Sequence, residues 1–146
     1  MPRNSVAYDD DFYAWTVEQA RLLRAGELAA IDTANIAEEL ESMGRRDRRE
    51  LENRLTDLLT HLLKWGFQTE PRSPSWSRTI REQRRQIEKL LRASPSLRGL
   101  VSPSIVESYA DAREDAAEET GLPDASFPAL CPFAPEEILA KGFLPR

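Results

Sequence analysis

The stretch RRDRRELENRLTDLLTHLLKWGF, residues 45–67, decides how the rest of this sequence is interpreted. At about 100° per residue, its leucines and Trp65 share one side of a helix, and this apolar side spans roughly 160° of the circumference. A helix at the surface of a protein needs a narrower stripe, so the stretch predicts the central helix of a bundle. His61, the one histidine of the chain, lies at the edge of the apolar side.

The segments around this helix repeat the same periodicity. Further helices are expected at residues 10–25, 32–44, 76–94 and 103–120. Gly26, Gly44 and Gly121 are expected to end three of them, because glycine readily adopts the left-handed conformation that follows many helices. Residues 122–146 contain five prolines and predict an apolar strap over the bundle, with one short helix after Pro135.

These elements predict an all-α fold. We expect one helical domain over residues 1–146, with about five longer helices, short helical turns and a flexible N-terminus at residues 1–8. No convincing β-strand is found in the pattern. The expected core consists of apolar residues on the inward stripes: Trp15, Leu40, Leu55, Leu58, Leu62, Trp65, Trp76, Ile80, Ile87 and Tyr109.

Charge is distributed unevenly along the chain. Residues 1–44 carry 3 Lys or Arg against 9 Asp or Glu, residues 45–98 carry 14 against 7, and residues 99–146 carry 3 against 9. Acidic helices beside basic ones explain this pattern, and an anionic partner for the basic middle is the less favoured alternative. With no membrane-spanning run, no signal peptide and a lone Cys131, a cytoplasmic protein that does not enter the membrane is expected.

Several polar side chains fall on or beside apolar stripes. Glu39, His61 and Gln83 do so, with Arg84 and Tyr109 as candidate partners. Buried polar groups must find partners, so we expect several of these residues to meet in one hydrogen-bonded cluster. A closed cluster would fix the register of the helices, whereas an open one around His61 and Glu39 would be the default site for a ligand or a metal.

Known catalytic and cofactor signatures are missing from the sequence, so no cofactor and no metal are expected. A histidine at the edge of an apolar stripe is most often a packed side chain bonded to a carboxylate, and Asp57 lies four residues before His61. The most basic helix face carries Arg78, Arg81 and Arg85 and is the candidate surface for an anionic partner. Cys131 has no basic neighbour in sequence and is interpreted as a buried, inert thiol.

Seven segments, in order, resemble a known bacterial family. They are YDDDFYAW, IAEELESMG, LLTHLLKW, SPSWSRTIREQR, SPSL, AAEETGLP and FPALCPF, and the family is called domain of unknown function twenty-nine. The resemblance implies a small helical protein without an established activity, and it supplies no catalytic residues. The positions that match the family pattern are Asn35, Glu38, Glu39, Gly44, His61, Lys64, Trp76, Gln83, Arg84 and Tyr109.

Three functions remain open at this point. The leading hypothesis is a non-enzymatic protein-interaction bundle, with a protein partner or a second copy of the chain. The second is a metal- or acid/base-dependent enzyme centred on His61 and Glu39. The third is a nucleic-acid binder that uses Arg78, Arg81 and Arg85, and it is the least favoured because Trp76 lies on the opposite face of the helix.

Overall fold

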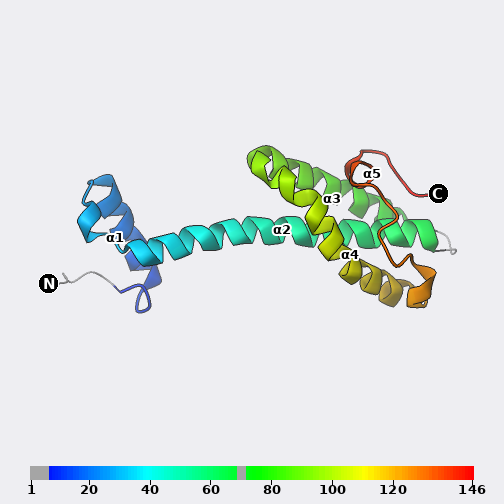
Figure 1. Cartoon of the computed structure of the whole chain (residues 1–146), viewed down its shortest axis with the longest axis horizontal. Helices are drawn as coiled ribbons and strands as arrows, with labels where there is room; N and C mark the ends of the chain where they lie inside the picture. The colour runs from blue at the N-terminus through cyan, green and yellow to red at the C-terminus, as the bar shows by residue number, and fades with distance from the viewer. Residues whose placement is uncertain (1–6, 69–71) are drawn as a thin grey trace. The chain divides into compact units, whose positions relative to one another are not determined.

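A computed structural model describes residues 7–68 and 72–146, and the regular elements in these ranges are all helical (Figure 1). The predicted all-α fold is therefore confirmed. Residues 1–6 of the expected flexible N-terminus lie outside the described ranges. The longer helices are α1 (Phe12–Arg24), α2 (Thr33–Phe67), α3 (Pro74–Ala93) and α4 (Arg98–Thr120), followed by the short α5 (Pro135–Leu139). The chain divides into two compact units, Met1–Arg46 and Asp47–Arg146.

Helix α2 corrects the prediction that one helix ends at Gly44 and another begins after it. The helix runs through this position, and Gly44 is not among the described glycines with positive φ. A glycine inside a helix costs only about 1 kcal/mol relative to alanine, and the charged residues that follow it are good helix formers. The two expected helices are therefore one, and the boundary between the two units falls within it.

The first unit is built around a small polar junction. The side chain of Asp32 accepts hydrogen bonds from Trp15 Nε1 (3.0 Å) and Asn35 Nδ2 (2.8 Å), and its backbone N–H donates to Gln19 Oε1 (2.7 Å). These bonds join α1 to the first turn of α2, where the Asp32 side chain also accepts from the backbone N–H of Asn35 (3.4 Å) as a helix cap does. They also hold the pKa of Asp32 below its usual value, chiefly through the bond from Asn35, although burial opposes this.

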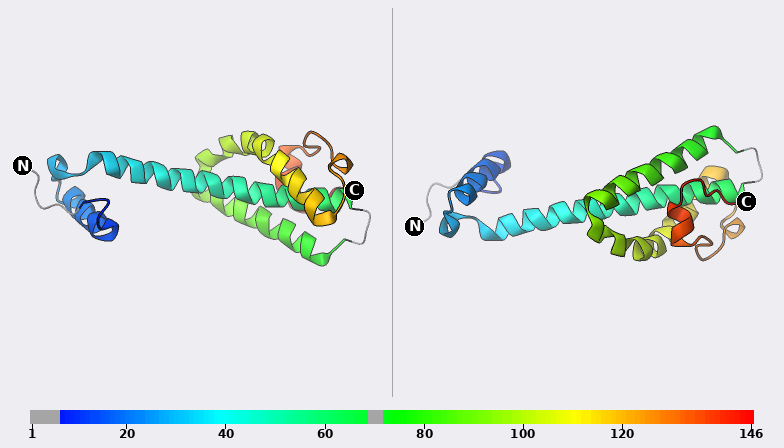
Figure 2. Two further views of the ribbon diagram at one scale, coloured as in Figure 1. Left: turned by 90° about the horizontal axis from the view of Figure 1, so that it is seen from below. Right: turned by 90° about the horizontal axis from the view of Figure 1, so that it is seen from above.

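The second unit holds the hydrophobic core. The C-terminal half of α2 lies beside α3 and α4 in all three views (Figures 1 and 2). Leu51, Leu55, Leu58, Leu59 and the leucines that follow them on α2 are fully buried. They pack against apolar side chains of α3 and α4 and against Phe127, Phe133 and Ile138 of the strap. The wide apolar side of residues 45–67 thus has neighbours around most of it, as its width predicted.

Two helix starts differ from the prediction. Helix α3 begins at Pro74 with Ser73 as its cap, two residues before the expected start at residue 76. Helix α4 begins at Arg98, so Pro103 lies inside it instead of opening it. A proline removes one backbone hydrogen bond in such a position, and the short turn Pro95–Leu97 has already directed the chain into the helix. Gly121 ends α4 with a φ of 75°, as predicted.

The strap, residues 122–146, is attached to the helices through its backbone. Tyr109 Oη donates to the carbonyl oxygen of Pro128 (2.6 Å), and Arg113 donates to those of Phe127 (3.2 Å) and Asp124 (2.9 Å). Arg84 donates from α3 to the carbonyl oxygens of Ile138 (2.8 Å) and Glu137 (3.2 Å). The phenylalanines of the strap and Ile138 complete the core, in agreement with the predicted apolar strap.

The predicted core is correct for most of its members in the second unit and partly wrong in the first. Leu40 was expected inside but is 62 % exposed, and Met43 and Val106 are exposed as well. Trp65 is half-buried against the core, and Trp76 is half-buried without being part of the core cluster. Periodicity identifies the apolar side of a helix, but it does not tell whether another element covers that side. None of the described helices combines the length and the apolarity needed to cross a membrane.

Candidate functional site

Asp57 connects two of the predicted cluster residues. Gln83 Nε2 of α3 donates to Asp57 Oδ2 (2.8 Å), and His61 Nδ1 lies 3.4 Å from Asp57 Oδ1 on α2. The same nitrogen donates to the carbonyl oxygen of Asp57 (2.9 Å), which fixes the proton on Nδ1 because a carbonyl can only accept. Arg54 in turn donates to Gln83 Oε1 (3.1 Å). The amide of Gln83 is therefore satisfied on both sides, which fixes α3 against α2.

The ionisation of this group follows from its contacts. Burial lowers the pKa of His61, but the hydrogen bonds and the negative charge of Asp57 outweigh it, and the pKa is raised overall. The hydrogen bond from His61 holds the pKa of Asp57 below its usual value, with a further contribution from Gln83 and against the effect of burial. The two side chains therefore favour each other's charged forms.

The apolar stripe of α2 did not predict that a lysine of the second unit is buried. Lys64 is 6 % exposed, and its Nζ donates to Glu119 Oε1 of α4 (2.8 Å) and lies 4.9 Å from the ring centroid of Trp76. A cation above a tryptophan face and beside a carboxylate is stabilised by both. Helical spacing could not have found it, because Lys64 falls about 180° from the centre of the apolar side of α2.

The predicted polar cluster forms only in part. His61 and Gln83 meet through Asp57, whereas Arg84 and Tyr109 bind backbone oxygens of the strap. Glu39 belongs to the first unit, where it accepts a hydrogen bond from Tyr8 Oη that raises the pKa of Tyr8 to about 12. The pairing of Glu39 with His61 stays a prediction.

Other reactive side chains have ordinary surroundings. Within residues 7–68 and 72–146, no group of three or more His, Cys, Asp or Glu side chains could hold a metal ion. Cys131 is half-buried, its Sγ lies 3.5 Å from the carbonyl oxygen of Phe133, and burial raises its pKa. The thiol is therefore largely protonated at neutral pH, in agreement with its interpretation as an inert side chain.

The three arginines of the predicted basic face of α3 have different surroundings. Arg85 forms an ion pair with Glu82 on the same helix. Arg78 is exposed, and no ion pair is found for it in the described part of the chain. Arg81 lines a cavity between α3 and the strap, together with Arg84 and Arg85. The basic residues thus do not form one uniform surface.

Seven of the ten exposed large hydrophobic residues in the described part of the chain belong to the first unit. On α1, the exposed Phe12 stacks on the buried Trp15 (5.7 Å between ring centroids), whereas Tyr13 and Val17 are exposed on another side of the helix. A helix that is apolar on opposite sides is normally covered on both. On α2, the exposed Leu40 and Met43 lie one turn apart. The apolar face of the first unit is defined here by its exposed members: Phe12, Tyr13, Val17, Leu23, Leu28, Leu40 and Met43.

Comparison with known proteins gives one match. The model of a family described as "Domain of unknown function DUF29" matches residues 7–144, which is nearly the whole chain. No curated protein and no solved structure matches the chain. The family resemblance expected from the seven sequence segments is therefore confirmed.

Proposed function

This chain belongs to the DUF29 family, and we propose that it is a non-enzymatic interaction protein that pairs with a second copy of itself through its first unit. The observation that supports this proposal is the apolar face of the first unit. Leu40 is 62 % exposed and Tyr13 is 78 % exposed, and five more large apolar side chains accompany them. Large exposed apolar areas mark interaction sites in proteins.

The first unit has too little core to be stable without further burial. Among the large apolar side chains described for this unit, from residue 7 onwards, only Trp15 and Leu22 are buried, together with the amide of Gln19. Domains of about 40 residues usually need a disulfide, a metal or association with another chain. A partner on the apolar face would supply the missing burial.

A second copy fits the α2 part of this surface, because Leu40 and Met43 lie one turn apart on the same side of the helix. Glu38 and Arg45 form an exposed ion pair (3.0 Å) on the opposite side of α2 and do not interrupt this apolar stretch. Two antiparallel copies of this segment would place Leu40 of each copy opposite Met43 of the other. A two-fold interface requires such a self-complementary patch. A cytoplasmic location is part of the same proposal.

The test measures the molecular mass of the full chain in solution. We expect a dimer for the unchanged chain and a monomer for the double variant Leu40→Glu and Met43→Glu. The matched control, Val106→Glu with Leu130→Glu, changes two equally exposed apolar residues of the second unit and should leave the dimer intact. A monomeric unchanged chain, or equal loss of the dimer in both double variants, would contradict the proposal.

Two alternative functions remain predictions: an enzyme and a nucleic-acid binder. An enzyme centred on His61 and Glu39 stays a prediction, since these residues belong to different units. Nucleic-acid binding through Arg78, Arg81 and Arg85 would show as filter binding at low salt that falls steeply as salt rises.

A further inference from the structure

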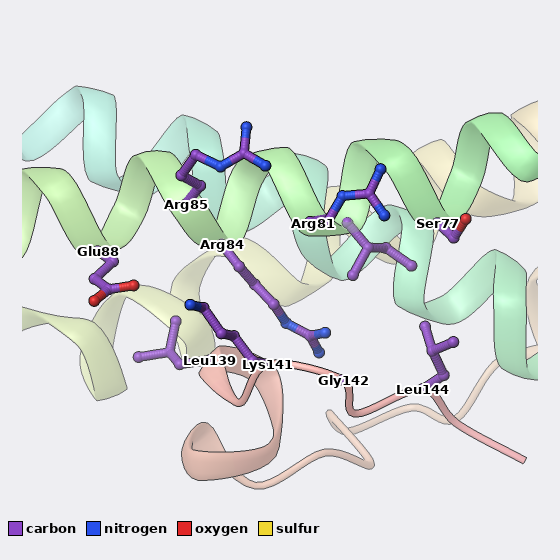
Figure 3. A pocket seen from close by; sticks show the side chains of 10 residues that line it. Ser77, Arg81, Arg84, Arg85, Glu88, Leu139, Lys141, Gly142 and Leu144 are labelled. Atoms are coloured by element: carbon purple, nitrogen blue, oxygen red, sulfur yellow. The ribbon is translucent and has the colours of Figure 1, made fainter.

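A cavity of about 470 Å³ lies between α3 and the end of the strap (Figure 3). Arg81, Arg84 and Arg85 of α3 and Lys141 of the strap line it, with Glu88 as the one acidic side chain. The volume falls within the range of about 300–1,000 Å³ that is usual for small-molecule sites. All lining residues belong to the second unit, so the cavity is independent of the apolar face.

Positive charge in this cavity is only partly neutralised by the protein. Glu88 pairs with Arg92 (2.6 Å), and Arg85 pairs with Glu82. No ion pair is formed by Arg81, Arg84 or Lys141 with any carboxylate in the two described ranges. Three cations therefore meet around one space without a carboxylate of their own, which favours an anion there.

Arg84 makes the cavity a built site and distinguishes it from an exposed basic patch. The residue is only 7 % exposed, and its guanidinium binds two carbonyl oxygens of the strap through Nε and one terminal nitrogen. A guanidinium has five N–H donors, so donors remain beyond these two bonds. Burial lowers the pKa of Arg84, because the charge is removed from water without a carboxylate beside it. Figure 3 shows Arg84 reaching from α3 towards the strap, while Lys141 rises from the strap towards α3.

Most of the remaining side chains of the lining are apolar. Ile80 of α3 is buried and lines the cavity together with Leu139 and Leu144 of the strap, which are labelled in Figure 3. An inorganic ion would leave these side chains exposed to water, whereas an aliphatic group would cover them. The lining therefore favours a ligand that has a negatively charged end and an aliphatic end.

We propose that this cavity binds a small amphiphilic anion, with its carboxylate or phosphate at Arg81, Arg84 and Lys141 and its aliphatic part against Ile80, Leu139 and Leu144. The forked donors of arginine suit both head groups, since each offers two oxygens in one plane. This inference does not depend on the pairing of two chains.

Calorimetric titration of the full chain tests the proposal with four probes. Octyl phosphate and octanoate carry both ends of the expected ligand, while octanol lacks the charge and inorganic phosphate lacks the aliphatic part. At least one amphiphile should bind about tenfold or more tightly than octanol and inorganic phosphate. The ranking of octyl phosphate against octanoate identifies the preferred head group. Failure of both amphiphiles to bind, or equal binding of octanol or inorganic phosphate, would overturn the proposal.

A pair of matched double variants places the binding in the cavity. Arg81→Gln with Lys141→Gln removes two lining cations without disturbing the bonds of Arg84, and it should weaken amphiphile binding by about tenfold or more. Arg78→Gln with Lys89→Gln removes the same two kinds of charge from exposed positions of α3 outside the cavity. It should leave the affinity within about twofold. If both double variants weaken amphiphile binding equally, the ligand is attracted to the basic surface in general, and binding in the cavity is refuted.

Discussion

The two units of this chain use apolar side chains in opposite ways. The second unit buries 19 apolar residues in one contiguous core, and among its described large hydrophobic residues only Val106, Leu130 and Leu144 are exposed. The first unit buries Trp15 and Leu22 and exposes seven others. Both contain segments of the same helix α2 with similar apolar periodicity. Helical pattern and burial are therefore separate properties, and the difference indicates which unit must find apolar contacts outside itself.

The largest expected difference between the units is in the stability that is lost when a leucine of α2 is replaced by alanine. Leu58 is fully buried, so Leu58→Ala should lower the free energy of unfolding by about 2–5 kcal/mol. Leu40→Ala should change it by less than about 0.5 kcal/mol at low protein concentration, where pairing does not contribute. Urea unfolding followed by circular dichroism measures both. Similar losses would mean that Leu40 is covered within the chain, which would remove the contrast between the units.

The next effect concerns the buried charge of the second unit. Glu119→Ala leaves Lys64 buried without its carboxylate and should cost about 1–3 kcal/mol. Glu118→Ala changes a neighbouring exposed acid on α4 and should cost less than about 0.5 kcal/mol. Thermal unfolding of the two variants compares them directly. If both shift the midpoint equally, contact with Trp76 alone is sufficient for Lys64.

Replacing either of two glycines by alanine should change the stability by about 1 kcal/mol, but with opposite signs. Gly121→Ala forces a side chain into a left-handed conformation in the second unit and should destabilise it by about 1 kcal/mol. Gly44→Ala should raise helix stability in the first unit by about 0.5–1 kcal/mol, because an added Cβ meets open space there. Circular dichroism at increasing temperature records both changes. Loss of helix in Gly44→Ala would indicate that the chain bends at this glycine.

The smallest expected effect is a pH dependence confined to the second unit. The raised pKa of His61 stabilises the fold fully below its unfolded pKa of about 6.5, and this contribution is lost as pH rises through the native pKa. Asp57, with its lowered pKa, keeps its contribution until the pH falls well into the acid range. The change near neutral pH should be about 1 kcal/mol or less, because Asp57 is partly exposed. Urea midpoints at a series of pH values should decline for the unchanged chain and stay flat for His61→Gln. A decline that persists in this variant would assign the pH dependence to another group.

The sequence predicts most of the helices because their apolar stripes are long and regular. It fails at Gly44 and Pro103, where an unfavourable residue costs less than the surrounding helix gains. It also misplaces Leu40, since the pattern shows which side of a helix is apolar and not what lies against that side. Local signals are therefore reliable for the type of element and weaker for its ends and its neighbours.

The candidate sites could be predicted only where the partners are side chains on helices. Gln83 was expected to need a partner, and it finds one in Asp57 on the facing helix. Arg84 and Tyr109 bind carbonyl oxygens of an irregular segment, and no residue pattern specifies which carbonyl will lie near. Arg81 was part of the expected basic face, but the approach of Lys141 from the strap depends on the path of the chain.

The attachment of the strap has a consequence for how this protein can change over evolutionary time. Arg84, Tyr109 and Arg113 recognise main-chain oxygens, and every amino acid carries the same carbonyl group. A position such as Asp124, whose side chain takes no part in these bonds, can therefore be replaced in descendants without losing the path of the strap. Two descendants could differ widely in this segment and still share its course. Retention of the three anchoring side chains would reveal that common course better than percentage identity.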